Sequence, residues 1–164
     1  MCQLTGRMTE HKYNGSHEQV AKAILQYSVN PMLDVINFFE QVVFSFLTGN
    51  ADMHLKNFSL INQPEVGYSL SPAYDLVSTA LVNPADEEEL ALTLNGKKRK
   101  ISRHDFTVSF TTLRLDAKQQ QNIFDKMENT KTEWFQFIDI SFISEEFKVA
   151  LKDQISGRFE KLKG

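Results

Sequence analysis

Two segments in the first third of the chain carry apolar residues at helical spacing. The first follows Ser16, a residue type that favours the position just before a helix, and Gln19 stands where it completes a capping box. Val20, Ile24 and Tyr27 then recur three or four residues apart. This pattern predicts an amphipathic helix that starts after Ser16.

The second segment is longer and more apolar. Asn30 and Pro31 are typical of a helix start, and Gly49 is typical of a helix end. The apolar positions between them that recur at helical spacing are Leu33, Ile36, Phe39, Val43, Phe46 and Leu47. We expect this segment to be the buried central helix of the fold.

The pattern then changes to short apolar segments separated by turn residues. Residues 58–61 and 67–70 flank a polar turn, which predicts a small β-hairpin. Residues 90–94 and 97–101 flank the pair Asn95-Gly96, whose residues both tolerate positive φ in a two-residue hairpin turn. We therefore expect a second small hairpin.

The C-terminal part of the chain returns to helical patterns. Ser102 and Asp105 form a capping box, and further helices are predicted over residues 116–128, 134–140 and 144–161. The expected fold class is mainly α, or α+β, with a helical bundle and two small hairpins. The length of 164 residues fits a single domain over residues 1–164.

Charge and composition narrow the classes of partner. The formal net charge of -3 gives no global positive field that would recruit nucleic acid or an anionic membrane. The basic run at residues 97–100 lies on one arm of the second predicted hairpin and lacks interleaved aromatic residues, so we interpret it as protection of a sheet edge. We expect no direct nucleic-acid partner and no membrane partner.

The cellular compartment follows from the cysteine count and the apolar pattern. Cys2 is the only cysteine and cannot form an internal disulfide, which fits a reducing compartment. The longest apolar stretch, residues 35–47, is interrupted by polar residues and is too short to span a bilayer. With no targeting signal visible, a cytoplasmic location is expected.

The candidate chemistry begins directly after the central helix. Asp52 and Asn57 are five residues apart, the interval between the catalytic acid and the magnesium-binding amide in the catalytic loop of protein kinases. A loop of this length can direct a carboxylate toward an attacking hydroxyl and an amide oxygen toward a hard cation. Turn and cap chemistry is the alternative explanation of such a pair.

A second carboxylate follows the first predicted hairpin. Kinases hold magnesium against the nucleotide phosphates with an aspartate that lies a hairpin's length beyond the catalytic loop, and Asp75 occupies that position. The alternative is that Asp75 caps a helix or shapes a turn. Asp75 is therefore the candidate second ligand of a magnesium ion.

The segments GNADMHLKNFSL (residues 49–60) and LSPAYDLVST (residues 70–79) closely resemble the catalytic and metal-binding motifs of HipA-type toxin kinases. Residues 4–24 and 143–162 also resemble the C-terminal domain of that family. The resemblance implies a kinase-like C-lobe, with ATP as co-substrate and Mg²⁺ as cofactor. It implies phosphorylation of serine or threonine on a protein substrate, for which aminoacyl-tRNA synthetases are the known class, and control by an antitoxin.

The same resemblance assigns the site residues. It makes Asp52 the catalytic acid/base, Asn57 a magnesium ligand and Asp75 the second magnesium ligand. Lys56 is a candidate for offsetting charge on the transferred phosphoryl group, although it lies four residues after the acid rather than the two usual in protein kinases. His54 lies in the same block near the phosphates, and we expect it to fix the turn by hydrogen bonding to the backbone.

The sequence lacks the motifs with which kinases hold the rest of the nucleotide. Its seven glycines form no G-x-G-x-x-G and no G-x-x-x-x-G-K-[ST], and no β-rich N-lobe precedes the catalytic loop. One hypothesis is a kinase half completed by an N-lobe on another polypeptide. The others are a non-catalytic protein-interaction module of a toxin–antitoxin or regulatory complex, and a metal-assisted hydrolase using Asp52, His54 and Asp75.

Overall fold

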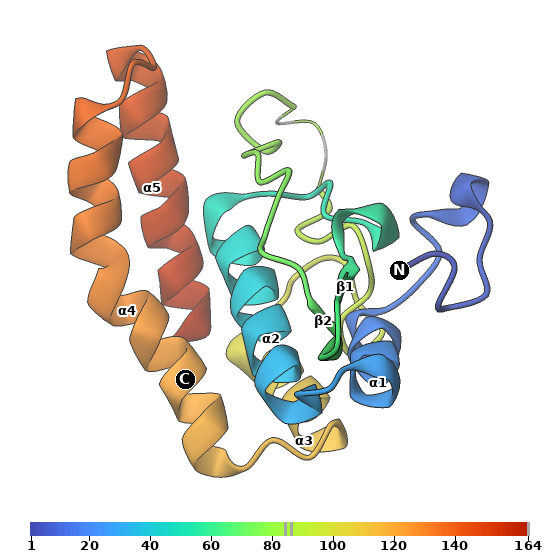
Figure 1. The fold of residues 1–164 in the computed structure, drawn as a ribbon. Coiled ribbons are helices and arrows are strands. Elements are labelled where there is room, and N and C mark those ends of the chain that lie inside the picture. Colours follow the sequence, from blue (N-terminus) through green and yellow to red (C-terminus); the bar gives the residue numbers. More distant parts are fainter. Residues whose placement is uncertain (84, 86, 164) are drawn as a thin grey trace.

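The computed structural model describes residues 1–83, 85 and 87–163 of the chain (Figure 1). The N-terminal part contains a 3-10 turn (Thr9–His11), helix α1 (His17–Tyr27) and helix α2 (Pro31–Thr48). A second 3-10 turn (Leu55–Asn57) and the strands β1 (Leu60–Gln63) and β2 (Gly67–Leu70) follow. Helices α3 (Arg103–Thr112), α4 (Ala117–Ile140) and α5 (Glu145–Leu162) form the C-terminal part.

Helix α2 is the central element, as the sequence predicted. It contacts α1, α4, α5 and β2, and it lies between α1 and the α4–α5 pair in Figure 1. It begins at Pro31 and ends before Gly49, which has the left-handed φ of 73°. Two details differ: Leu33 is exposed rather than buried, and the Asn30 side chain makes no cap hydrogen bond.

Aromatic side chains join α2 to its neighbours. Phe38 packs edge-on against Phe58, with ring centroids 4.9 Å apart, and Phe39 packs in the same way against Phe110 of α3 at 4.8 Å. Each such pair contributes about 0.5–1.5 kcal/mol beyond its burial. Because Phe58 directly follows the candidate loop, these contacts fix the end of that loop to the core.

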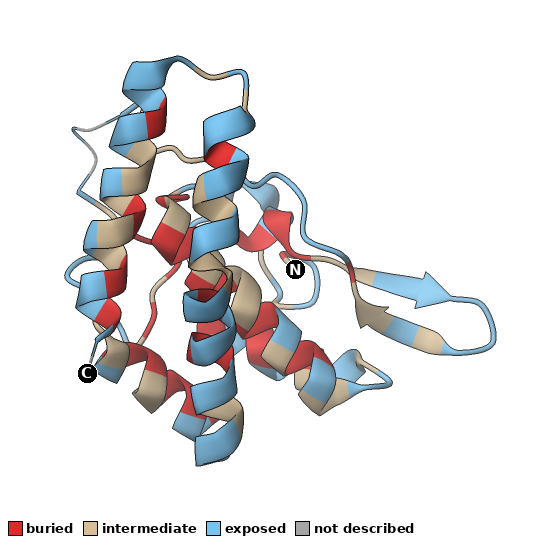
Figure 2. Cartoon of the chain, turned by 90° about the vertical axis from the view of Figure 1, so that its left-hand side faces the viewer, coloured by how far each residue is buried: buried red, intermediate tan, exposed pale blue. Residues whose placement is uncertain are grey.

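Helices α4 and α5 form an antiparallel pair along one side of α2 (Figure 1). The two helices predicted over residues 116–128 and 134–140 are one continuous helix, α4. The intervening residues 129–133 contain neither glycine nor proline, so nothing interrupts the backbone hydrogen bonds. Figure 2 shows buried positions on the inward faces of both helices, while the outer faces are exposed.

The first predicted hairpin is confirmed. Strands β1 and β2 pair antiparallel, with Leu60 opposite Leu70 and Gln63 opposite Gly67. The hairpin projects from the helical body, and most of its residues are exposed (Figure 2). Its base therefore lies next to the candidate loop, and its tip lies away from the core.

The second predicted hairpin is present only as a turn. Leu94 and Lys97 form an isolated bridge, and the described residues of this region form no strand. The reason is that Thr93 pairs with the segment before α1: its N–H donates to the Gly15 carbonyl, and its carbonyl accepts from the His17 N–H. The prediction of two strands here was wrong because these long-range partners compete with the local turn.

The basic run does not protect a sheet edge, because no strand forms there. Lys97 pairs with Asp105 at 2.7 Å, and Arg99 pairs with Glu87 at 2.5 Å. Lys98 lies 3.3 Å from Glu88. These cations are thus offset by neighbouring carboxylates.

The helices of the described residues do not meet the requirements for crossing a membrane. None of them combines the length and the apolar character that crossing a bilayer requires.

His17 carries a pH dependence of stability. Its side chain is fully buried against the rings of Phe38 and Phe58, and neither ring nitrogen has a hydrogen-bond partner among the described residues. Burial lowers the pKa of His17 from 6.5 to about 4. Between these values the unfolded chain binds a proton that the folded chain does not, so stability falls as the pH falls.

We therefore predict that the free energy of unfolding decreases by up to about 3 kcal/mol through this group as the pH falls from about 6.5 to about 4. Urea denaturation of the wild-type chain and of His17→Leu over this range measures the effect. The wild type should show the steeper pH dependence, and His104→Leu, at an exposed position, should behave like the wild type. Equal slopes for wild type and His17→Leu would contradict the prediction.

Candidate active site

The loop that follows α2 is fixed at its start by its own backbone and by Asn50. The Gly49 and Asn50 N–H groups donate to the Phe46 and Ser45 carbonyls, which closes the C-terminal turn of α2 around the left-handed glycine. The Asn50 side chain is buried, and its amide oxygen accepts from the Asp52 N–H at 3.2 Å. Asp52 is therefore presented by a turn that Asn50 closes.

Helix α5 satisfies the last carbonyls of α2. Gln154 Nε2 donates to the Thr48 carbonyl at 2.9 Å, and Arg158 Nη1 donates to the Phe46 carbonyl at 2.9 Å. The final carbonyls of a helix lack intrahelical partners and carry partial negative charge, which a guanidinium stabilises. The start of the candidate loop is thus held by a helix more than a hundred residues further along the chain.

The segment after β2 is tied to the candidate loop by three side chains: Thr79, Tyr74 and Asn50, whose Nδ2 donates to the Asp75 carbonyl at 3.4 Å. Thr79 Oγ1 accepts from the Ala51 N–H at 2.9 Å and lies 3.3 Å from the Gly49 carbonyl. The Tyr74 hydroxyl donates to the Lys56 carbonyl at 2.9 Å. Because Tyr74 directly precedes Asp75, this contact positions the second candidate carboxylate against the loop.

Asn57 and Asp75 are in direct contact. Asn57 Nδ2 donates to Asp75 Oδ2, and the Asn57 amide oxygen accepts from the His54 N–H at 3.1 Å. Asn57 is buried, and Asp75 has a left-handed backbone with φ of 56°. Asparagine and aspartate adopt this conformation more readily than most residues, so an aspartate is well suited to the position.

Asp52 lies at the exposed side of the same loop. Its Oδ1 accepts a hydrogen bond of 2.6 Å from the Tyr13 hydroxyl, and this bond raises the pKa of Tyr13 to about 12. No hydrogen bond joins Asp52 to Asn57 or Asp75 in the described part of the chain. The structure therefore pairs Asn57 with Asp75, while Asp52, on the same short loop as Asn57, is paired with Tyr13.

His54 and Lys56 have contrasting environments. The His54 ring is buried and lies edge-on to the Tyr13 ring, with centroids 5.0 Å apart, and burial, together with Lys12, lowers its pKa. Its Nδ1 has no partner among the described residues, and the edge-on contact with Tyr13 packs the ring against the turn. The Lys56 side chain is exposed and enters no ion pair with the described residues.

The paired residues Asn57 and Asp75 carry the oxygen atoms that a hard cation would use. Among the described residues no group of three or more histidine, cysteine, aspartate or glutamate side chains is arranged to hold a metal ion. Asp52, His54 and Asp75 therefore do not form the ligand set that a metal-assisted hydrolase would need. Asn57 and Asp75 offer an amide and a carboxylate oxygen, the few protein ligands that magnesium uses when phosphates supply others.

Several contacts that support the site could not be predicted from the sequence. The loop is contacted by Tyr13, Tyr74 and Thr79. The last turn of α2, just before the loop, is contacted by Gln154 and Arg158. The partners of these residues lie between 18 and 112 residues away, so no local spacing could reveal them. Asn50 is the exception, because a polar residue directly after a helix-ending glycine is a common turn signal.

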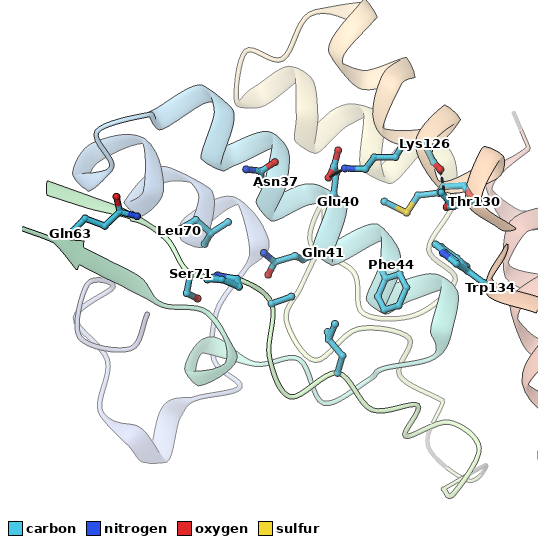
Figure 3. Close-up of a pocket in the computed structure, with 14 residues that line it drawn as sticks. Asn37, Glu40, Gln41, Phe44, Gln63, Leu70, Ser71, Lys126, Thr130 and Trp134 are labelled. Carbon is cyan, nitrogen blue, oxygen red and sulfur yellow. Dashed lines mark hydrogen bonds and ion pairs between the residues drawn. The ribbon is translucent and has the colours of Figure 1, made fainter. Parts of the chain in front are cut away.

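A cavity of about 660 Å³ lies beside the second candidate segment (Figure 3). It is bounded by Phe44 of α2, Trp134 of α4 and residues 70–73 and 76. The Glu40–Lys126 ion pair lies at its rim. None of the five candidate site residues lines this cavity, so it is a neighbour of the site and not part of it.

Known proteins match the chain in sequence and in fold. The family model described as the HipA-like C-terminal domain matches residues 1–134. A protein of Sinorhizobium fredii named "Putative kinase" is 40% identical over 99 residues, which cover 60% of this chain and 23% of that protein. A protein of Haemophilus influenzae with the same name is 40% identical over 65 residues, or 40% of this chain and 19% of that protein.

A solved structure shares the fold. The match is a chain in the Shewanella oneidensis complex of HipA, HipB and operator DNA, with a TM-score of 0.80 and 21% identity. It covers 98% of this chain and 42% of the other. The chain thus spans less than half of that protein and about a quarter of its first curated relative.

The contact between α5 and the loop start gives a paired test with two glycines. A Cβ at Gly49 would lie 2.0 Å from Gln154 Nε2 and would impose a side chain on a φ of +73°, whereas a Cβ at Gly157, inside α5, meets nothing within 4 Å. Gly49→Ala should lower the free energy of unfolding by about 1–3 kcal/mol. Gly157→Ala should raise it by about 0.5–1 kcal/mol.

Equilibrium unfolding in urea measures both changes. Equal effects of the two substitutions would show that the end of α2 is not constrained as described.

Proposed function

The chain belongs to the family of HipA-like C-terminal domains, and from that premise we propose that it is the part of a serine/threonine protein kinase that carries the catalytic base and the magnesium ligands. The observation that carries this proposal is the contact between Asn57 and Asp75. The loop that presents Asp52 also carries Asn57, and the segment after the hairpin brings the Asp75 carboxylate into contact with the Asn57 amide. Phosphoryl transfer from ATP needs these three groups close together.

Each residue has a role that its environment supports. Asp52 would accept the proton of the acceptor hydroxyl, because its carboxylate is exposed on the loop. Asn57 and Asp75 would hold Mg²⁺: the Asn57 oxygen has a second lone pair besides the one used by the His54 N–H, and Asp75 has a second carboxylate oxygen. The ion would neutralise charge on the nucleotide phosphates.

Lys56 and His54 would have different roles near the nucleotide phosphates: Lys56 would offset charge, and His54 would shape the loop. Lys56 is exposed and enters no ion pair with the described residues, so its ammonium is free to approach a phosphoryl group. The buried His54 is neutral at pH 7 because burial lowers its pKa. We assign His54 to shaping the loop beside the phosphates and not to offsetting their charge.

The nucleotide-binding part would come from elsewhere. The sequence contains no glycine-rich phosphate loop, and the chain matches only a fraction of the length of its relatives. We propose that an N-lobe in a longer protein or on a separate polypeptide completes the ATP site. The acceptor would be a serine or threonine of a protein, and the family resemblance points to an aminoacyl-tRNA synthetase.

A non-catalytic interaction module is the second candidate. The structural neighbour was solved in a complex with HipB and DNA, and this chain exposes large apolar side chains around the α4–α5 turn, namely Phe137, Ile140 and Phe142. Exposed apolar side chains of this size favour contact with another protein. An antitoxin-like protein is the partner that this candidate implies.

The two candidates differ in magnesium-dependent nucleotide binding. We predict that a longer protein carrying an N-lobe with this chain binds ATP with Mg²⁺, and that Asp75→Ala weakens the binding at least about tenfold because a magnesium ligand is lost. The chain alone should bind weakly. Asp153→Ala, at an exposed position of α5, is the matched control and should leave binding unchanged.

Isothermal titration calorimetry measures these affinities. A phosphorylation assay with the same proteins should show that Asp52→Asn lowers kcat by about 10²-fold or more with little change in ATP affinity. Absence of ATP binding in every form would overturn the kinase proposal and leave the interaction module.

A further inference from the structure

The hydroxyl of Tyr13 contacts the candidate catalytic base from a remote part of the chain. It donates a hydrogen bond of 2.6 Å to Asp52 Oδ1, across 39 residues of sequence. The distance lies within the range over which a base meets the proton that it will accept. A donor in this position affects either the orientation of Asp52 or access to it.

The segment that carries Tyr13 is attached to the loop at several points. The Lys12 carbonyl accepts from the Leu55 N–H at 3.1 Å, and the amino group of Met1 donates to the Leu55 and Phe58 carbonyls at 2.9 and 2.8 Å. The Tyr13 ring lies edge-on to the His54 ring, and Lys12 Nζ lies 4.8 Å from the centroid of the Tyr13 ring. These contacts hold the segment that carries Tyr13 against residues 54–58, directly after Asp52.

Asp52 has little else to orient its side chain. Its backbone N–H is held by Asn50, but its carboxylate accepts no hydrogen bond from any described residue besides Tyr13. Oδ2 therefore remains available to an acceptor hydroxyl. An exposed carboxylate held at one oxygen loses rotational freedom, and fixing a reacting group in this way can account for a large share of a rate.

We propose that Tyr13 is a positioning residue that holds Oδ1 of Asp52 and so directs Oδ2 toward the acceptor hydroxyl. The proposal rests on the proposed kinase function, because it concerns the base of that reaction. Tyrosine suits this role since its hydroxyl stays protonated at physiological pH: the bond to Asp52 raises the pKa of Tyr13 to about 12. The charged or titratable groups in contact with its side chain are Asp52, His54 and Lys12.

The hydrogen bond can be tested on the 164-residue chain without any activity. In a chain labelled with ¹³C at the tyrosine ζ carbon, an ordinary exposed tyrosine is about three quarters ionised at pH 10.5, whereas a pKa of about 12 leaves about 3% ionised. NMR spectra from pH 7 to 10.5 should show one late-titrating signal that is absent in Tyr13→Phe. Asp52→Asn should make that signal titrate with the others, and circular dichroism confirms that the chains stay folded.

The effect on the reaction is measured in the longer protein that carries the N-lobe. Tyr13→Phe keeps the ring contacts and should lower kcat about tenfold, with the KM for ATP changed less than twofold. Tyr27→Phe, which alters another exposed tyrosine, should leave both constants unchanged. A merely structural role of Tyr13 would not lower kcat selectively.

The outcomes distinguish a failure of the positioning role of Tyr13 from a failure of the proposed kinase function. An unchanged or raised kcat in Tyr13→Phe would overturn the positioning role, and a raised kcat would mean that Tyr13 masks the base. Absence of a late-titrating tyrosine signal in the wild-type chain would also overturn the positioning role. Absence of phosphorylation by the wild-type longer protein would instead overturn the proposed function, even with the hydrogen bond present.

Discussion

The end of helix α2 is the constraint on which the candidate site depends. The chain must leave a buried helix, reverse direction at Gly49 and expose a polar loop within a few residues. Helix α5 supports this turn because Gln154 donates to the Thr48 carbonyl and Arg158 donates to the Phe46 carbonyl, which also accepts from the Gly49 N–H. Within the loop, the backbone N–H groups of Gly49 and Asn50 close the helix, and the polar side chains from Asp52 onward remain for the site.

The support of α2 by α5 links the part of the chain that the family model matches to a helix that lies outside the match. The family model matches residues 1–134, which include both candidate loops, whereas α5 begins at residue 145. Gln154 and Arg158 nevertheless contact the last turn of α2, from which the first of these loops starts. The C-terminal helix is therefore part of the support of the site and not an independent addition to it.

Local chemistry explains what could be predicted from the sequence. Ser16 with Gln19 and Ser102 with Asp105 form the expected capping boxes, and Pro31 and Gly49 bound α2, because each signal acts within a few residues. Asp52, Asn57 and Asp75 were identified as candidates from their spacing and from the resemblance to HipA-type kinases. The structure adds that Asn57 and Asp75 are in contact.

Long-range contacts explain what could not be predicted. The segment around Thr93 has the pattern of a hairpin arm, yet its hydrogen bonds go to Gly15 and His17. The contact from Tyr13 to Asp52 likewise joins segments 39 residues apart, with no local pattern to reveal it. The candidate base and the candidate metal ligands were visible in the sequence, whereas the long-range hydrogen bonds that hold them in place were not.

The central claim is that Asn57 and Asp75 act together on one cation, and paramagnetic broadening by Mn²⁺ in ¹⁵N NMR spectra tests it most directly. At low Mn²⁺ the side-chain amide of Asn57 and the backbone amide of Asp75 should broaden first, while Gly67 at the hairpin stays sharp. Asp75→Ala should abolish the selective broadening. First broadening around the acidic residues 87–89, with Asn57 unaffected, would contradict the account.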